Sequence, residues 1–100
     1  MGTLVWFRND LRLRDNPALY HACERGDVVA VFFICVAQWR DHDVGDNRLA
    51  FLLDCLHHLK RDLHDHRIPL RVEHAARFAE VRDRIVGLAR ALKLDRVAFN

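Results

Sequence analysis

Arginine and aspartate side chains suited to ligand recognition gather directly after the first apolar run of this sequence. The run is Leu4–Phe7, and the charged residues that follow it are Arg8, Asp10, Arg12, Arg14 and Asp15. Guanidinium groups bind planar or anionic groups through paired hydrogen bonds, and neighbouring carboxylates hold them in place. The cluster therefore predicts a site that supports a planar ligand or docks a second domain. A solvated loop with weak local ion pairs accounts for the same residues equally well.

Other kinds of site receive little support. The sequence contains no serine, so no Ser-His-Asp set can form, and its four glycines form none of the Gly-rich loops that cradle dinucleotides or triphosphates. His57, His58, His64 and His66 are close in sequence, but their spacing does not supply a tetrahedral metal shell. We expect solvated histidines on a helix and no metal site. A ligand at the charged cluster must therefore be held by side chains.

The cysteines fit structural roles better than catalytic ones. Cys23, Cys35 and Cys55 lie at wide, irregular spacings inside apolar segments, and we expect all three to be reduced core residues. Cys35 lies in the most apolar run, where burial raises the pKa of a thiol and makes it inert. Core packing is therefore the favoured interpretation of Cys35.

The apolar runs predict strands that place the charged cluster. Leu4–Phe7 and Val28–Val36 are continuously apolar and rich in β-favouring residues, which is typical of strands buried on both faces of a parallel sheet. Leu70–Glu73 alternates apolar with charged residues, which predicts an edge strand. Arg96–Phe99 has strand character again. The sequence thus predicts four strands.

Helical periodicity separates the predicted strands. Asn16 and Pro17 form a helix start, and the helix over residues 18–25 ends at Gly26. Leucines at spacings of three and four predict a long amphipathic helix that Pro69 cannot continue: Leu49, Leu52, Leu53, Leu56, Leu59 and Leu63. A further apolar stripe from Phe78 to Leu92 contains Gly87, which is either a weak point or a close helix-to-sheet contact.

Alternating strands and helices with right-handed crossovers predict the α/β class, as a doubly wound, Rossmann-like parallel sheet with strand order 3-2-1-4. In that order a crevice opens at the carboxyl ends of the first and fourth strands, where the charged cluster and Asn100 converge. The apolar fourth strand would be an unpaired edge. We therefore expect residues 1–100 to be one domain, incomplete at that edge and part of a longer protein.

Composition restricts the function only weakly. The formal net charge of +2 is too small to indicate nucleic acid or an anionic membrane by itself. Val28–Ala37, the longest apolar run, is about half of what a membrane-spanning helix needs, and no secretory leader pattern opens the sequence. We expect a cytoplasmic protein without a membrane segment.

The residues from Val5 to Leu19 resemble the amino-terminal signature of the DNA photolyase and cryptochrome family. They meet every fixed position of its Arg-x-Asp-Leu-Arg-x-x-Asp-Asn-x-x-Leu pattern, from Arg8 to Leu19. Gln38-Trp39, Asn47-Arg48 and Arg67-Ile68-Pro69-Leu70 also match, so the similarity covers the whole sequence. The resemblance implies the amino-terminal α/β domain of a protein whose larger helical domain, absent from these residues, binds FAD and DNA.

The resemblance implies a parent that is a deoxyribodipyrimidine photolyase, a light-driven lyase that repairs pyrimidine dimers in DNA and is monomeric at full length. A cryptochrome photoreceptor that signals without repair is one alternative, and a separate ligand-binding α/β module is another. In the family this domain holds an antenna chromophore, which is a folate, a deazaflavin or a flavin. The resemblance and the crevice together nominate six antenna-binding residues and no catalytic residue: Phe7, Arg8, Asp10, Ile34, Cys35 and Arg48.

Overall fold

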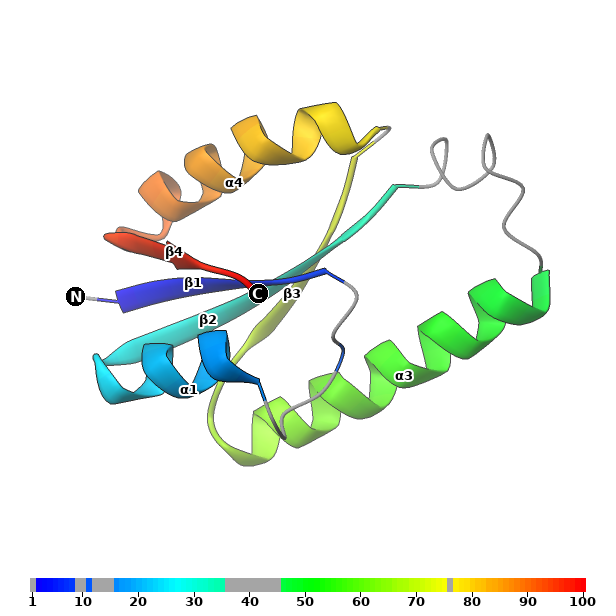
Figure 1. Cartoon of the computed structure of the whole chain (residues 1–100), viewed down its shortest axis with the longest axis horizontal. Helices are drawn as coiled ribbons and strands as arrows, with labels where there is room; N and C mark the ends of the chain where they lie inside the picture. The colour runs from blue at the N-terminus through cyan, green and yellow to red at the C-terminus, as the bar shows by residue number, and fades with distance from the viewer. Residues whose placement is uncertain (1, 9–10, 12–15, 36–45, 76) are drawn as a thin grey trace.

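A parallel sheet organises the computed structural model of this chain, which describes residues 2–8, 11, 16–35, 46–75 and 77–100 (Figure 1). Within these residues the sheet has four strands: β1 (Gly2–Phe7), β2 (Asp27–Ile34), β3 (Leu70–His74) and β4 (Arg96–Ala98). Their order is β3-β2-β1-β4, and each neighbouring pair is parallel. The α/β class, the doubly wound arrangement and the predicted strand order are confirmed.

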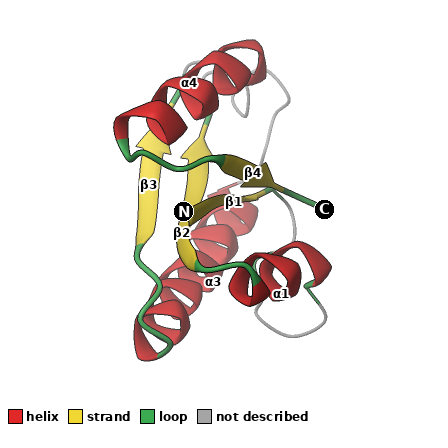
Figure 2. Cartoon of the chain, turned by 90° about the vertical axis from the view of Figure 1, so that its left-hand side faces the viewer, coloured by secondary structure: helices red, strands yellow, loops and turns green. Residues whose placement is uncertain are grey.

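Helices cover both faces of the sheet. They are α1 (Pro17–Glu24), α3 (Asp46–Asp65) and α4 (Phe78–Ala91). Figures 1 and 2 show α1 and α3 on one side of the sheet and α4 on the other. Among the described residues, no helix is long and apolar enough to cross a membrane.

The side chains of the two inner strands alternate between two apolar cores. Val5, Phe7 and Phe32 pack with the leucines of α3 beneath one face. Leu4 and Val31 pack with the apolar stripe of α4 on the other face. Because both faces are buried, these strands read as continuous apolar runs rather than as alternating ones. β3 is an edge strand whose middle residues are partly exposed, as its alternating sequence predicts.

The three cysteines, which the sequence predicts to be buried, differ in their exposure. All three are free thiols; Cys35 is buried, Cys55 is half-buried and Cys23 is exposed. The prediction is therefore wrong for Cys23. The eight-residue helix α1 buries only Ala18, Leu19 and Ala22 of its residues, and Cys23 lies just beyond this narrow apolar face.

Gly87 is a weak point in α4 and not a close contact, because a Cβ atom built there meets nothing within 4 Å. We expect Gly87→Ala to raise the free energy of unfolding by about 0.5–1 kcal/mol, since alanine reduces the freedom of the unfolded chain and favours the helix. Equilibrium urea unfolding measures the change. Gly26→Ala is the matched control and should be destabilising, because Gly26 has a φ of 132°, which strains an L side chain. A loss of stability in Gly87→Ala would contradict this expectation.

Candidate functional site

The carboxyl ends of β1 and β4 meet at the point where the strand order reverses. Thr3 pairs with Arg96 and Val5 with Ala98, so the residues after each strand emerge at the same edge of the sheet. In open α/β sheets this edge is the usual place for a ligand, since the crossover helices diverge on opposite faces there. The candidate site predicted from the sequence therefore lies at the end of β1, β4 and the start of α1.

An aromatic and cationic cluster, formed by Trp6, Arg8 and Phe99, lies at this edge. The ring centroids of Trp6 and Phe99 are 5.5 Å apart with an interplanar angle of 58°. The Cζ atom of Arg8 lies 5.1 Å from the centroid of the Trp6 ring and 6.0 Å from that of Phe99. Cation–π attraction orients the planar guanidinium against both rings. Phe99 is 54% exposed, so the cluster offers solvent an aromatic surface beside a planar positive charge.

A hydrogen-bonded pair of asparagines joins the other side of this edge. Asn100 Nδ2 donates to Asn16 Oδ1 at 2.7 Å, and Asn16 Oδ1 also accepts from the Leu19 N–H at 3.1 Å. Asn100 Oδ1 accepts from the Ala18 N–H at 3.0 Å. Asn16 caps α1, as its sequence position predicts, but it also ties that helix to the end of β4. We call Asn16 and Asn100 the asparagine clasp.

The nominated residues divide between the two faces of the sheet. Phe7 is 1% exposed and, with the partly buried Ile34, packs on the α1 and α3 side. Cys35 is 1% exposed and packs on the α4 side, where Arg8 contacts Trp6. These four residues therefore lie at the carboxyl ends of neighbouring strands but do not share one face.

The other two predicted antenna-binding residues are Arg48 and Asp10, of which the structure describes Arg48. Arg48 is exposed on the first turns of α3, which Figure 1 shows extending past the carboxyl ends of the strands. Asp10 lies outside the described residues, as do Arg12, Arg14 and Asp15.

Sequence reasoning did not nominate Trp6, Phe99 or the asparagine clasp. One signal for Trp6 was available, because residues 6 and 8 of an extended strand share a face. The predicted strand order places Asn100 at this edge but does not reveal its partners, because the contacts of Phe99 and Asn100 depend on the register between β1 and β4.

Cys35 is poorly suited to nucleophilic chemistry. Burial raises the pKa of its thiol, and the negative charge of Glu80 raises it further. The neutral thiol is therefore the stable form in the fold, which agrees with the core role predicted from the sequence.

The cysteines should differ strongly in alkylation. We expect Cys23 to react with iodoacetamide within the native state and Cys35 to react only as the fold opens, because Cys23 is exposed and Cys35 is buried. The raised pKa of Cys35 also stabilises the fold below the ordinary thiol pKa, and this contribution is lost as the pH rises above that value. Mass spectrometry after timed alkylation measures the first effect, and unfolding between pH 7 and about pH 10 measures the second. Cys35→Ala should remove part of the pH dependence of the free energy of unfolding. Rapid alkylation of Cys35 in the native state would contradict its burial.

The histidines show no sign of a metal centre. His57, His58, His64 and His66 are exposed, and no group of three or more metal-binding side chains occurs among the described residues. The Nδ1 atoms of His58 and His66 lie within hydrogen-bonding distance of backbone carbonyls one turn earlier, at 2.8 Å and 2.9 Å. The four histidines are solvated as predicted, but only His57, His58 and His64 lie on α3, and His66 follows its last residue.

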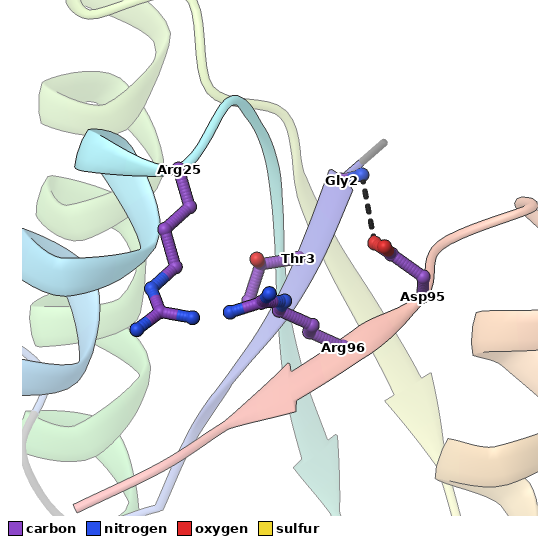
Figure 3. Close-up of a pocket in the computed structure, with 5 residues that line it drawn as sticks. All are labelled: Gly2, Thr3, Arg25, Asp95 and Arg96. Carbon is purple, nitrogen blue, oxygen red and sulfur yellow. Dashed lines mark hydrogen bonds between the residues drawn. The ribbon is translucent and has the colours of Figure 1, made fainter.

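A small pocket of about 150 Å³ lies at the opposite, amino-terminal ends of the strands. Figure 3 shows Arg25 and Arg96 beside Thr3, with Asp95 accepting from the Gly2 N–H at 3.1 Å. Arg25 is the C-cap of α1, where a positive charge complements the helix dipole. Arg25 and Asp95 therefore have structural roles at this pocket, and the candidate site proposed from the strand order lies at the opposite, carboxyl ends.

Comparisons with known proteins identify a family over almost the whole chain. Residues 3–100 match the family described as DNA photolyase. The deoxyribodipyrimidine photo-lyase of Salmonella typhimurium is 34% identical over 99 residues, and the match covers 97% of this chain and 21% of that protein. The enzyme of Vibrio cholerae is 34% identical over 98 residues, with coverage of 97% and 21%. Cryptochrome-1 of Sinapis alba is 39% identical over 61 residues, which are 61% of this chain and 12% of that protein. The chain spans about a fifth of the length of these photo-lyases.

Proposed function

Because this chain belongs to the DNA photolyase family, we propose that it serves as the amino-terminal α/β domain of a deoxyribodipyrimidine photolyase. The observation that carries the proposal is the similarity to the photo-lyases of Salmonella typhimurium and Vibrio cholerae over 97% of the chain, against 61% for two plant cryptochromes. In this proposal residues 1–100 belong to one α/β domain of a protein about five times as long. The dimer-splitting chemistry belongs to a flavin-binding domain outside these residues.

We propose that this domain contributes the binding site of an antenna chromophore. When bound, such a group absorbs light and passes the excitation to FAD, which needs a fixed distance and orientation. Support comes from the cluster of Trp6, Arg8 and Phe99, whose aromatic rings and planar cation suit a conjugated heterocycle. Arg8 and Trp6 would contact the chromophore, Phe7, Ile34 and Cys35 would support the edge from within the core, and Asp10 and Arg48 would line its surroundings.

The proposed function also includes a compartment, a substrate and an oligomeric state. Three free thiols suit a reducing compartment, so we propose the cytoplasm. The proposed substrate is DNA that contains pyrimidine dimers, bound mainly by the helical domain, and the proposed full-length protein is a monomer.

Repair activity is the first test of the proposal. The full-length protein should purify with flavin and, when reduced and illuminated, should remove dimers from an irradiated oligonucleotide; a sample kept in the dark is the control. Cryptochrome function is the second candidate, favoured by 39% identity to two cryptochromes over 61 residues. Bound flavin without dimer loss would support that candidate, and a protein without flavin would contradict both.

The antenna site has a separate test in the same protein. Arg8→Ala should weaken binding of the antenna chromophore by about fivefold to thirtyfold, the effect of losing a cation–π contact of about 1–2 kcal/mol. Repair driven by direct excitation of FAD should stay unchanged. Arg61→Ala, an exposed arginine on α3, is the matched control. Equal chromophore content in the wild type and Arg8→Ala would remove Arg8 from the proposed site.

A further inference from the structure

The amino end of α1 occupies the position at which many doubly wound folds bind phosphate. The helix follows β1 and begins at the carboxyl edge of the sheet, beside the point where the strand order reverses. Unpaired backbone N–H groups and the helix dipole make such an end attractive to a phosphate group. The state of the first N–H groups of α1 therefore bears on which ligands the crevice can accept.

None of the first three helical positions of α1 offers a donor to a ligand. Pro17, at the first position, has no N–H group. The Ala18 N–H donates to Asn100 Oδ1 at 3.0 Å, and the Leu19 N–H donates to Asn16 Oδ1 at 3.1 Å. The next N–H, of Tyr20, donates to the Asn16 carbonyl at 3.0 Å, as an ordinary helical bond.

Asn100 takes the place that a phosphate oxygen would need. Its Oδ1 atom is the acceptor for Ala18, and its Nδ2 atom donates to Asn16 Oδ1 at 2.7 Å, so the side-chain amide is held at both ends. Asn16 is only 4% exposed, so the acceptor shared by Asn100 and Leu19 belongs to a buried residue, while Asn100 itself is exposed. A phosphate could reach Ala18 only by breaking both bonds of the Asn100 side chain and leaving a buried acceptor with fewer partners.

We propose that Asn100 is a specificity-determining residue that closes the amino end of α1 to phosphate. The crevice then selects a planar ligand held by stacking and side chains, without a phosphate group at α1. The cluster of Trp6, Arg8 and Phe99 supplies the stacking surface at the same edge. The ligand class rests on the proposed antenna function, whereas the closure of α1 does not.

Inorganic phosphate tests the closure without any chromophore. In the full chain labelled with ¹⁵N, the amide signals of Ala18 and Leu19 should not respond to added phosphate. Asn100→Ala frees the Ala18 N–H, and its signal should then shift and saturate. Asn100→Asp is the matched control: its carboxylate can still accept from Ala18 and adds a repelling charge, so the signal should remain unresponsive.

Two results would overturn the closure. One is a saturable shift of the wild-type Ala18 signal, and the other is an unresponsive signal in a folded Asn100→Ala protein. If Asn100→Ala does not fold, the phosphate titration of the wild type and the hydrogen exchange of the Ala18 amide still test the closure. An Ala18 N–H that is bonded to Asn100 exchanges slowly, whereas one that is open to solvent exchanges fast.

Riboflavin and its 5′-phosphate, FMN, test the ligand class by flavin fluorescence. The wild type should bind riboflavin at least about tenfold more tightly than FMN, and Asn100→Ala should narrow this ratio. Equal or stronger binding of FMN would overturn the ligand class. Binding of neither flavin, nor of a deazaflavin or folate probe, would count against the proposed antenna function, while the phosphate titration would still decide the closure.

Discussion

Phe7→Ala is expected to lower the free energy of unfolding by about 3–5 kcal/mol, the usual cost of removing a buried aromatic ring. Phe7 is 1% exposed and packs in the core between the sheet and the helices α1 and α3. Removing the ring loses its burial and leaves a cavity that a parallel sheet, fixed by hydrogen bonds on both sides of β1, cannot easily close. A domain of this size has a total stability of roughly 5–15 kcal/mol, so the change would populate the unfolded state measurably at moderate urea.

Equilibrium urea unfolding, followed by circular dichroism, measures the effect of Phe7→Ala. Phe51→Ala is the matched control, because the side chain of Phe51 is 69% exposed on α3 and should change stability by less than about 0.5 kcal/mol. Phe7→Leu keeps most of the volume and should cost less than about 1.5 kcal/mol. A Phe7→Ala protein of unchanged stability that binds the antenna chromophore poorly would instead make Phe7 a direct ligand residue.

Asn16→Ala is expected to cost about 1.5–2.5 kcal/mol, which is more than the loss of a helix cap. The cap itself accounts for about 1 kcal/mol, the value that the sequence position alone predicts. The structure adds the bond from Asn100 Nδ2, so the substitution also removes one hydrogen bond of the exposed Asn100 side chain to the buried Asn16. The end of β4 and the start of α1 should both become less stable.

A double-mutant cycle separates the two contributions of Asn16. If the asparagine clasp acts as a unit, Asn16→Ala and Asn100→Ala together should cost less than the sum of the single changes, by roughly 0.5–3 kcal/mol. Asn16→Asp is the control, since a carboxylate still caps the helix and still accepts from Asn100. Strictly additive single changes would show that the bond between the two asparagines contributes no stability.

The sheet and its order could be predicted because the relevant signals are local. A strand buried on both faces is apolar along most of its length, as β1 is from Leu4 to Phe7 and β2 from Val28 to Ile34, and an edge strand such as β3 can alternate. With helices between successive strands, right-handed crossovers leave few possible orders. The helix start at Asn16 also depends only on neighbouring residues.

The contacts of the candidate site could not be predicted in the same way. Trp6 and Phe99 meet because β1 and β4 pair in one particular register, and a shift by one residue would place one ring on the opposite face. Cys23 lies in an apolar segment but is exposed, because the packing of a short helix decides which of its residues are covered. Local sequence carries no information on either outcome.

The sequence by itself thus determined the α/β class, the strand order, the capped start of α1 and the edge of the sheet at which the first and fourth strands end side by side, since periodicity, capping and chain direction are properties of neighbouring residues. Only the tertiary structure decided which side chains meet at that edge. It stacked Arg8 on Trp6 and Phe99, and it brought Asn100 to Asn16 across 84 positions of the chain. The physical reason is that register and side-chain hydrogen bonds between distant strands and helices are set by the packing of the whole sheet.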